Sequence, residues 1–169
     1  MSTEQTGQDI VIVAAKRTPM GGFQGALSEV ASPVLAATAI KGLIAQTGIS
    51  VDAVDEVLMG CVLPAGLGQA PARQATLGAG LPLSVGATTV NKVCGSGMKT
   101  VMLAHDLIKA GSSQVVVAGG MESMSQAPYL LDKARSGMRM GHGKVMDHMF
   151  LDGLEDAYTG GAMGTFAQK

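Results

Sequence analysis

The chain has 169 residues, of which 47% are hydrophobic and 15% are charged, and its formal net charge is −1. A chain this apolar and this long can bury the core of one domain, so the composition excludes an intrinsically disordered protein. The small net charge and the absence of tryptophan also exclude a strongly basic or base-stacking surface for nucleic acid.

No segment has the features of a membrane span or a targeting signal. The longest uncharged stretch, residues 74–91, contains Gly, Pro, Thr and Gln, and the N-terminal run MSTEQTGQD is polar and acidic. The two cysteines, Cys61 and Cys94, are expected to be free thiols rather than a disulfide framework. We therefore expect a cytoplasmic protein, and its few charges suggest large contacts with other polypeptide chains.

Strands and helices are predicted to alternate along the first part of the chain. The apolar run at residues 9–15 is typical of a buried strand. Ser32 and Pro33 suit the start of a helix, with the serine as its cap, and Gly48 suits its end.

The same alternation continues as far as Gly120. Apolar strands that alternate with helices predict an α/β fold, in which a mostly parallel sheet lies between helices on both faces. The expected strands cover residues 55–62, 88–93 and 114–120, and the expected helices cover residues 71–80 and 97–110.

The composition changes near Gly119 and Gly120. Residues 1–120 contain seven basic and seven acidic residues, whereas the much shorter segment 121–169 contains five and six. The change predicts a boundary between one domain over residues 1–120 and a different segment over residues 121–169. The second segment is rich in Met, Gly and Ser, so we expect an irregular excursion with one helix near residues 147–158.

The segment around Cys94 carries the clearest chemical signal. This cysteine lies where an expected strand meets an expected helix, and Gly95, Ser96 and Gly97 allow a sharp turn and the close approach of a substrate. A thiol at the start of a helix faces unpaired N–H groups, which favour the thiolate and can stabilise an oxyanion. The arrangement is similar to the nucleophile elbow of hydrolases. A lone cysteine in an apolar segment is also often a small buried hydrophobe, and that alternative stays open.

A nucleophilic cysteine needs a base, and the three histidines offer no clear candidate. His105 is eleven residues beyond Cys94 on the same expected helix, about 16 Å along its axis, which is too far for proton transfer. His142 and His148 lie in the irregular segment, where solvent exposure is expected. Cys61 has no glycine-rich turn beside it and is expected to pack inside a strand.

Other ligand signals are weak. No cluster of Cys and His has the spacing of a zinc site, and residues 19–25 lack the phosphate-loop patterns, so we expect no metal and an ordinary loop. Basic residues are in excess between 132 and 147, and either a phosphorylated ligand or, more commonly, a solvated loop explains such an excess. These basic residues are Lys133, Arg135, Arg139 and Lys144.

Several motifs together resemble the N-terminal part of the thiolase family, and its biosynthetic members most closely. The matching stretches, in the family's order, are IVAAKRTPMGGFQGALS, GQAPARQATLGAGLP, NKVCGSGMKTVMLA and VAGGMESMSQAPYLL. The stretches DGLEDAY and MGTFAQ are similar to the start of the family's loop domain. The resemblance implies a thiolase-like fold, in which residues 1–120 form an N-terminal α/β domain without its last strand and residues 121–169 begin the loop domain.

The resemblance also implies a chemistry. Cys94 matches the family's nucleophilic cysteine, which takes an acetyl group from acetyl-CoA. A second acetyl-CoA then attacks this acetyl group, and the overall products are acetoacetyl-CoA and CoA. The reverse reaction, thiolysis, uses the same groups. The N–H of Cys94 would help bind the thioester oxygen. Met163 would line the acyl pocket, beside Ala162, where the family often has a larger or polar residue. The resemblance implies no cofactor. It implies a homodimer or a homotetramer.

The chain is much shorter than members of this family. The family's second catalytic cysteine, catalytic histidine and active-site asparagine lie in the missing C-terminal half, so the resemblance implies that this chain alone is inactive. The truncated sheet is also expected to expose an unpaired edge and apolar helix faces. Two other interpretations stay open: a related condensing enzyme of the β-ketoacyl synthase type, and a non-catalytic fragment that acts only in subunit packing.

Overall fold

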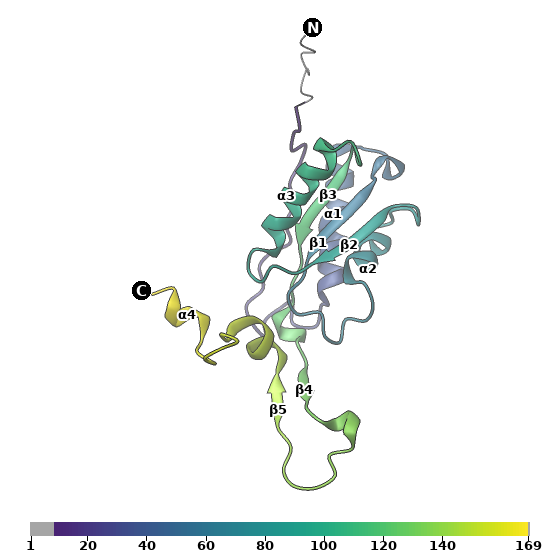
Figure 1. The fold of residues 1–169 in the computed structure, drawn as a ribbon. Helices are drawn as coiled ribbons and strands as arrows, with labels where there is room; N and C mark the ends of the chain where they lie inside the picture. Colours follow the sequence, from purple (N-terminus) through teal and green to yellow (C-terminus); the bar gives the residue numbers. More distant parts are fainter. Residues whose placement is uncertain (1–8, 169) are drawn as a thin grey trace.

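The computed structural model describes residues 9–168, which form an α/β layer and an extension from it (Figure 1). A short 3₁₀ turn, η1 (Val51–Ala53), precedes the first strand of the layer. The other elements of the layer, in chain order, are α1 (Ser32–Thr47), β1 (Glu56–Gly60), α2 (Pro71–Gly78), β2 (Gly86–Val90), α3 (Ser96–Lys109) and β3 (Val116–Gly120).

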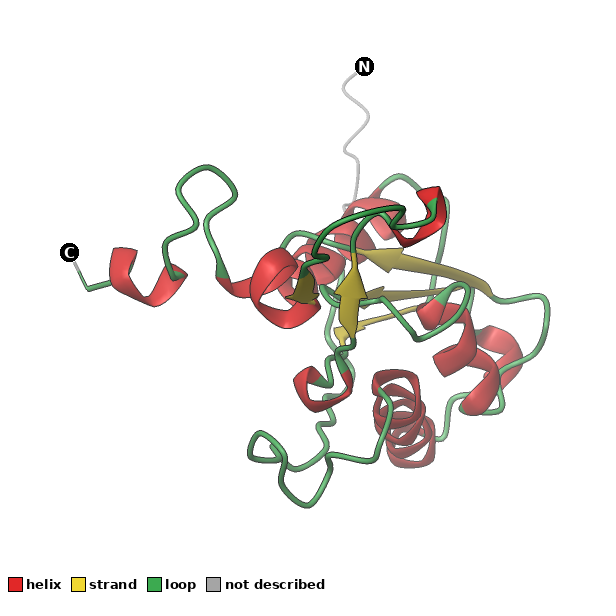
Figure 2. Ribbon diagram, turned by 90° about the horizontal axis from the view of Figure 1, so that it is seen from below, coloured by secondary structure: helices red, strands yellow, loops and turns green. Residues whose placement is uncertain are grey.

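The three strands form a parallel sheet in the order β2-β1-β3. Glu56 lies opposite Gly86 on one side and Val116 on the other, so the carboxyl ends of the strands meet at one edge. The helices cover both faces: α1 and α2 pack together on one face, and α3 packs against β1 and β3 on the other (Figure 1 and Figure 2). This arrangement confirms the expected α/β class.

The core lies between the central strand and the pair α1 and α2. Val57, Met59 and Cys61 alternate along and just after β1, and they are buried beside Ala36 and Ile40 of α1. The opposite face of β1 meets α3, and Leu58 is buried there too. Because both faces of β1 are covered, its sequence is continuously apolar after Glu56.

The first helix has the predicted extent but not the predicted cap. Gly48 ends α1 in the left-handed conformation, with a φ of 66°, and its N–H donates to the carbonyl of Ile44. The prediction that Ser32 caps the helix is wrong. Ala31 is the N-cap, and Ser32 is buried in the first turn without a capping hydrogen bond.

The strand predicted at residues 9–15 is absent. This segment has no regular structure, and Val11, Ile12 and Val13 are 70%, 82% and 70% exposed. A strand forms when a neighbouring strand pairs with its N–H and C=O groups. None of the described strands pairs with this segment, so its apolar sequence alone does not make it a strand.

The other predicted elements are present with shifted ends. The strands predicted at 55–62 and 114–120 are found in shorter form as β1 and β3, and the helices predicted at 71–80 and 97–110 are α2 and α3. The strand predicted at 88–93 is β2, which ends at Val90 because the chain then turns toward α3.

The segment after Gly120 contains more structure than expected. Strands β4 (Tyr129–Leu131) and β5 (Val145–Asp147) form an antiparallel ribbon that projects away from the layer (Figure 1). Single 3₁₀ turns lie at η2 (Met124–Gln126) and η3 (Ala134–Ser136). The helix predicted near 147–158 is shorter and includes a π-helical turn, η4 (Phe150–Leu154), and α4 (Met163–Phe166) follows it.

Over residues 9–168, no helix combines the length and the hydrophobicity that a membrane span requires.

Candidate active site

The carboxyl ends of the three parallel strands adjoin a cavity of about 690 Å³. Open α/β sheets commonly bind ligands outside this edge, because the loops that follow the strands meet there. All three of these loops contribute to the wall. They supply Val62 and Leu63 after β1, Val93 and Cys94 after β2, and Met121 and Glu122 after β3.

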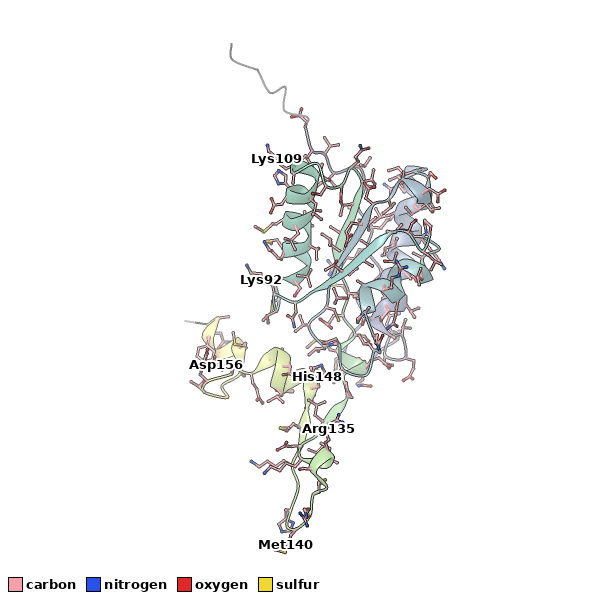
Figure 3. The ribbon with its side chains drawn as sticks, turned by 45° about the vertical axis from the view of Figure 1, so that its right-hand side comes forward. Lys92, Lys109, Arg135, Met140, His148 and Asp156 are labelled. Carbon is pink, nitrogen blue, oxygen red and sulfur yellow. The ribbon has the colours of Figure 1, made fainter. Side chains whose placement is uncertain are left out.

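Cys94 lies in the turn between β2 and α3, where the sequence places it, and its exposed side chain lines the cavity. Gly95 is the N-cap of α3. Among residues 9–168, the N–H group of Cys94 donates no hydrogen bond, whereas the nitrogen of Gly97 packs against Gly60 of the central strand. Figure 3 labels Lys92, in the turn before α3, and Lys109, the last residue of α3. Cys94 is two residues after Lys92.

Glycines allow the start of α3 to lie directly on the sheet. A Cβ atom added to Gly60 would be 2.7 Å from the backbone nitrogen of Gly97 and from the carbonyl carbon of Ser96. A Cβ atom added to Gly120 would be 3.3 Å from the Cα of Gly97. The missing side chains therefore set how closely the turn with Cys94 approaches the strand ends.

Cys61 has a different environment. It is 1% exposed, and its thiol donates to Oε1 of Glu122 at 3.7 Å. Burial, together with the negative charge of Glu122, raises the pKa of the Cys61 thiol to about 11. The prediction that Cys61 is a packed residue is thus confirmed, and it contrasts with the exposed Cys94.

Glu122 has a site role that the sequence analysis missed. Its Oε2 accepts a hydrogen bond from the N–H of Val62 at 2.7 Å, and its Oε1 accepts one from the N–H of Leu63 at 3.1 Å. The carboxylate therefore joins the loop after β3 to the loop after β1. It accepts hydrogen bonds from Cys61, Val62 and Leu63, and within the described residues it has no hydrogen bond with Cys94.

The expectation that His148 is exposed is wrong. The residue is 5% exposed, and both ring nitrogens have partners. Nδ1 lies 2.5 Å from Oδ2 of Asp152, and Nε2 accepts from the N–H of Ala65 at 3.4 Å. A ring nitrogen that accepts a hydrogen bond carries no proton, so Nδ1 is the donor to Asp152. His142 and His105 are exposed, as expected for His142. Within the described residues, none of the three histidines contacts Cys94.

In the structure of residues 9–168, Met163 does not line the cavity. It begins α4, is 47% exposed, and α4 lies beside the C-terminus, apart from the sheet (Figure 1). Ala162 is the N-cap of the same short helix. The acyl-pocket role of Met163 therefore stays a prediction.

The basic residues between 132 and 147 lie on the loop that joins β4 and β5. They are exposed and form no ion pair within the described part of the chain, as a solvated loop would have them. Figure 3 places Arg135 on this loop and Met140 at its tip, on the end of the ribbon remote from Cys94. Over residues 9–168, no group of His, Cys, Asp and Glu side chains has the arrangement of a metal site.

The loop at residues 19–25 has the irregular structure expected, but it also forms part of the cavity wall. The N–H of Gln24 donates to Oγ of Ser125 at 2.9 Å, and the side chain of Gln126 donates to the carbonyl of Ser28. These bonds hold the loop against the segment after β3, beside Phe23 and Leu27 of the wall. Neither glutamine has a pattern that could reveal this contact from sequence.

The sequence of the chain is similar to those of known proteins. The family description "Thiolase, N-terminal domain" matches residues 10–169. A protein of Pseudomonas aeruginosa named "Acetyl-CoA acetyltransferase" is 53% identical over 162 residues, which are 96% of this chain and 41% of that protein.

Two eukaryotic relatives have similar names and are matched over a similar share of their length. "Acetyl-CoA acetyltransferase, mitochondrial" of Danio rerio is 53% identical over 168 residues, which are 99% of this chain and 40% of that protein. "Acetyl-CoA acetyltransferase 2" of Arabidopsis thaliana is 52% identical over 95% of this chain and 40% of its own length. The chain thus spans about two fifths of the length of these relatives.

Proposed function

We propose that this chain, which belongs to the thiolase family, supplies the nucleophilic cysteine of an acetyl-CoA acetyltransferase. The names of its relatives support the activity. The observation that carries the proposal is the position of Cys94, an exposed thiol in a cavity at the carboxyl edge of the sheet and at the start of α3. Acetyl-CoA, acetoacetyl-CoA and CoA are the proposed substrates and products.

In the proposed first step, Cys94 loses its thiol proton to solvent, and the resulting thiolate attacks the carbonyl carbon of acetyl-CoA. A C–S bond to Cys94 forms, the C–S bond to CoA breaks, and CoA leaves as a thiolate that takes up a proton. Negative charge develops on the carbonyl oxygen during the attack. The N–H group of Cys94 donates to no other described residue and is suited to stabilise that oxygen.

In the proposed second step, a base removes a proton from the methyl group of another acetyl-CoA. The resulting carbanion attacks the acetyl carbon held on Cys94, a C–C bond forms, and the C–S bond to Cys94 breaks to release acetoacetyl-CoA. The reverse thiolysis passes through the same bonds. No histidine among residues 9–168 contacts Cys94, so we expect the base to come from the part of the relatives' length that this chain does not span.

The proposal has consequences for activity and assembly. Without a base, this chain by itself is expected to form no C–C bond, although Cys94 can still react with a thioester or an alkylating reagent. Its exposed apolar residues, such as Met98 and Met102 on α3, are consistent with the proposed homodimer or homotetramer. The cytoplasmic location also stays a prediction, and one relative is named as mitochondrial.

A second candidate function is a non-catalytic fragment that only packs against other chains. The observation in its favour is the absence of a base beside Cys94 within the described residues. A condensing enzyme of the β-ketoacyl synthase type is a third candidate; it would use substrates on a carrier protein and a decarboxylation in place of acetyl-CoA deprotonation.

Competitive alkylation separates these candidates. The chain is treated with iodoacetamide at neutral pH with and without acetyl-CoA, and each cysteine peptide is followed by mass spectrometry. The acetyltransferase proposal predicts that Cys94 reacts much faster than the buried Cys61 and that acetyl-CoA slows Cys94 alone. Equal rates, or no effect of acetyl-CoA, favour the packing fragment. Protection by a malonyl-carrier protein but not by acetyl-CoA favours the β-ketoacyl synthase type.

A further inference from the structure

Val93, the residue before Cys94, has an uncommon backbone conformation. Its φ of 46° lies in the left-handed region, which β-branched residues almost never occupy. Its side chain is 50% exposed and lines the cavity, so deep burial of the valine is not what holds it there. A residue keeps such a conformation only when surrounding interactions hold it in place.

Two polar side chains hold the two peptide groups of Val93. Oδ1 of Asn91 accepts a hydrogen bond from the N–H of Val93 at 2.9 Å. Oγ of Ser96 donates to the carbonyl of Val93 at 2.6 Å and accepts from the N–H of Lys92 at 2.8 Å. Both the N–H and the C=O of Val93 are therefore hydrogen-bonded, immediately before Cys94 in the chain.

Each of these side chains is itself attached to the rest of the site. Nδ2 of Asn91 donates to the carbonyl of Val62 at 3.4 Å, and the N–H of Val62 donates to Glu122. Ser96 is 4% exposed and lies against Gly60 of the central strand. The turn is thus connected to the loop after β1 by Asn91 and to the sheet by Ser96.

From these contacts we propose that Asn91 and Ser96 are positioning residues, which hold Val93 in the left-handed conformation and thereby direct the Cys94 thiol into the cavity. The proposal deepens the proposed function, because it rests on Cys94 as the reacting group. Without the two side chains, Val93 would relax to an ordinary φ and turn the following residue away from the start of α3. Displacements of about 1 Å can cost about a hundredfold in rate at a catalytic group.

The chain contains a matched control for Ser96. Lys133 also has a left-handed φ, of 58°, and Oγ of Ser136 donates to its carbonyl at 2.9 Å, three residues back as in the turn of Cys94. This second turn lies in the exposed loop between β4 and β5, remote from the cavity (Figure 3). Removal of the Ser136 hydroxyl changes the same local geometry without touching the site.

The test measures iodoacetamide alkylation of Cys94 in the full chain, with the buried Cys61 as an internal reporter of folding. Asn91→Ala and Ser96→Ala are expected to slow Cys94 about tenfold or more, since the thiol leaves its place at the helix start. Adding Val93→Gly to either variant is expected to recover most of the rate, because glycine adopts a positive φ without a steric cost. Ser136→Ala should match the parent.

The proposal is overturned if Asn91→Ala and Ser96→Ala leave the Cys94 rate unchanged while Cys61 stays protected, or if Val93→Gly recovers none of a lost rate. Where Ser96→Ala unfolds the chain, the exposed Asn91 supplies the test by itself. Protection of the parent Cys94 by acetyl-CoA is measured separately. Its absence rejects the proposed function, whereas the rates of the variants still decide whether the two side chains position the thiol.

Discussion

At the scale of single residues, the two cysteines illustrate how environment separates two identical groups. Cys61 has apolar surroundings and donates a hydrogen bond to a carboxylate, whereas Cys94 lines the cavity. The raised pKa of Cys61 means that the folded state favours its neutral thiol. This difference has a measurable consequence for stability at alkaline pH.

We predict that the stabilising contribution of a neutral Cys61 thiol is complete below pH 9 and is lost as the pH rises through about 11, because its folded pKa is raised from 9.0 to about 11. Urea unfolding of the parent and of Cys61→Ala, measured at several pH values, checks this. The free energy of unfolding of the parent should fall more steeply above pH 9. Parallel curves for the two proteins would disprove it.

At the scale of elements, the contact between β1 and α3 has little room for change. Gly60→Ala places a Cβ atom 2.7 Å from backbone atoms of Ser96 and Gly97, so the start of α3 must shift. Overpacking of this kind costs about 1–3 kcal/mol. We expect Gly60→Ala to lower the free energy of unfolding by about that amount and to slow alkylation of Cys94.

The matched control is Gly164→Ala in α4, where an added Cβ atom meets no atom within 4 Å. It should leave both the unfolding curve and the Cys94 rate unchanged. If Gly60→Ala behaved in the same way, the close contact between the sheet and α3 would not be what places the thiol.

The pairing of β1 with β3 depends on a carboxylate just before β1. Oδ2 of Asp55 accepts hydrogen bonds from the N–H groups of Val115 at 2.9 Å and Gln114 at 2.6 Å, and these bonds lower the pKa of Asp55 below 3.8. Its contribution to stability is therefore present above pH 3.8 and is lost as the pH falls through the lower folded pKa.

Asp55→Asn replaces the charged acceptor with a weaker neutral one. We expect this variant to be less stable than the parent at neutral pH, and the difference between the two to shrink on acidification below pH 3.8. Thermal unfolding followed by circular dichroism over this pH range measures the difference. A difference that stays constant with pH would show that the ionised form of Asp55 adds nothing.

At the scale of the whole molecule, one face of α3 is apolar and uncovered. Met98, Val101 and Met102 are 73%, 45% and 52% exposed on this helix. Contiguous apolar surface of this kind drives association in water. The exposed apolar residues 11–13 enlarge the apolar surface of the chain, and the edge strands β2 and β3 each have one side without a described strand partner.

We therefore expect the isolated chain to self-associate at micromolar concentration and the double variant Met98→Glu, Met102→Glu to be more nearly monomeric. Lys109→Glu alters the charge of the same helix without changing the apolar face, and it should associate as the parent does. Sedimentation velocity over a range of concentrations compares the three proteins. A monomeric parent would contradict the expectation.

The sequence predicted the sheet and the placement of Cys94 well because both depend on local patterns. Apolar runs and helix-ending glycines mark β1, β3 and α1, and the glycines around Cys94 mark a turn. The pattern at residues 9–15 was misleading, because a strand depends on a partner and not only on its own sequence.

The missed parts of the site depend on contacts between distant segments. Glu122 bonds to residues about sixty positions earlier in the chain, and His148 is buried by a contact with Ala65. Composition and periodicity contain no record of such long-range hydrogen bonds. The positive φ of Val93 was missed for a different reason, since its hydrogen bonds to Asn91 and Ser96 are local but propensity argues against a left-handed valine.

The most direct test of the central claim is to incubate the chain with acetyl-CoA, quench in acid, and locate any added acetyl group by peptide mass spectrometry. Our account predicts one acetyl group on Cys94, labile to hydroxylamine as a thioester is, with none on Cys61 and no acetoacetyl-CoA in solution. Acetylation of lysines alone, or of both cysteines only after unfolding, would contradict the assignment of Cys94 as the nucleophile.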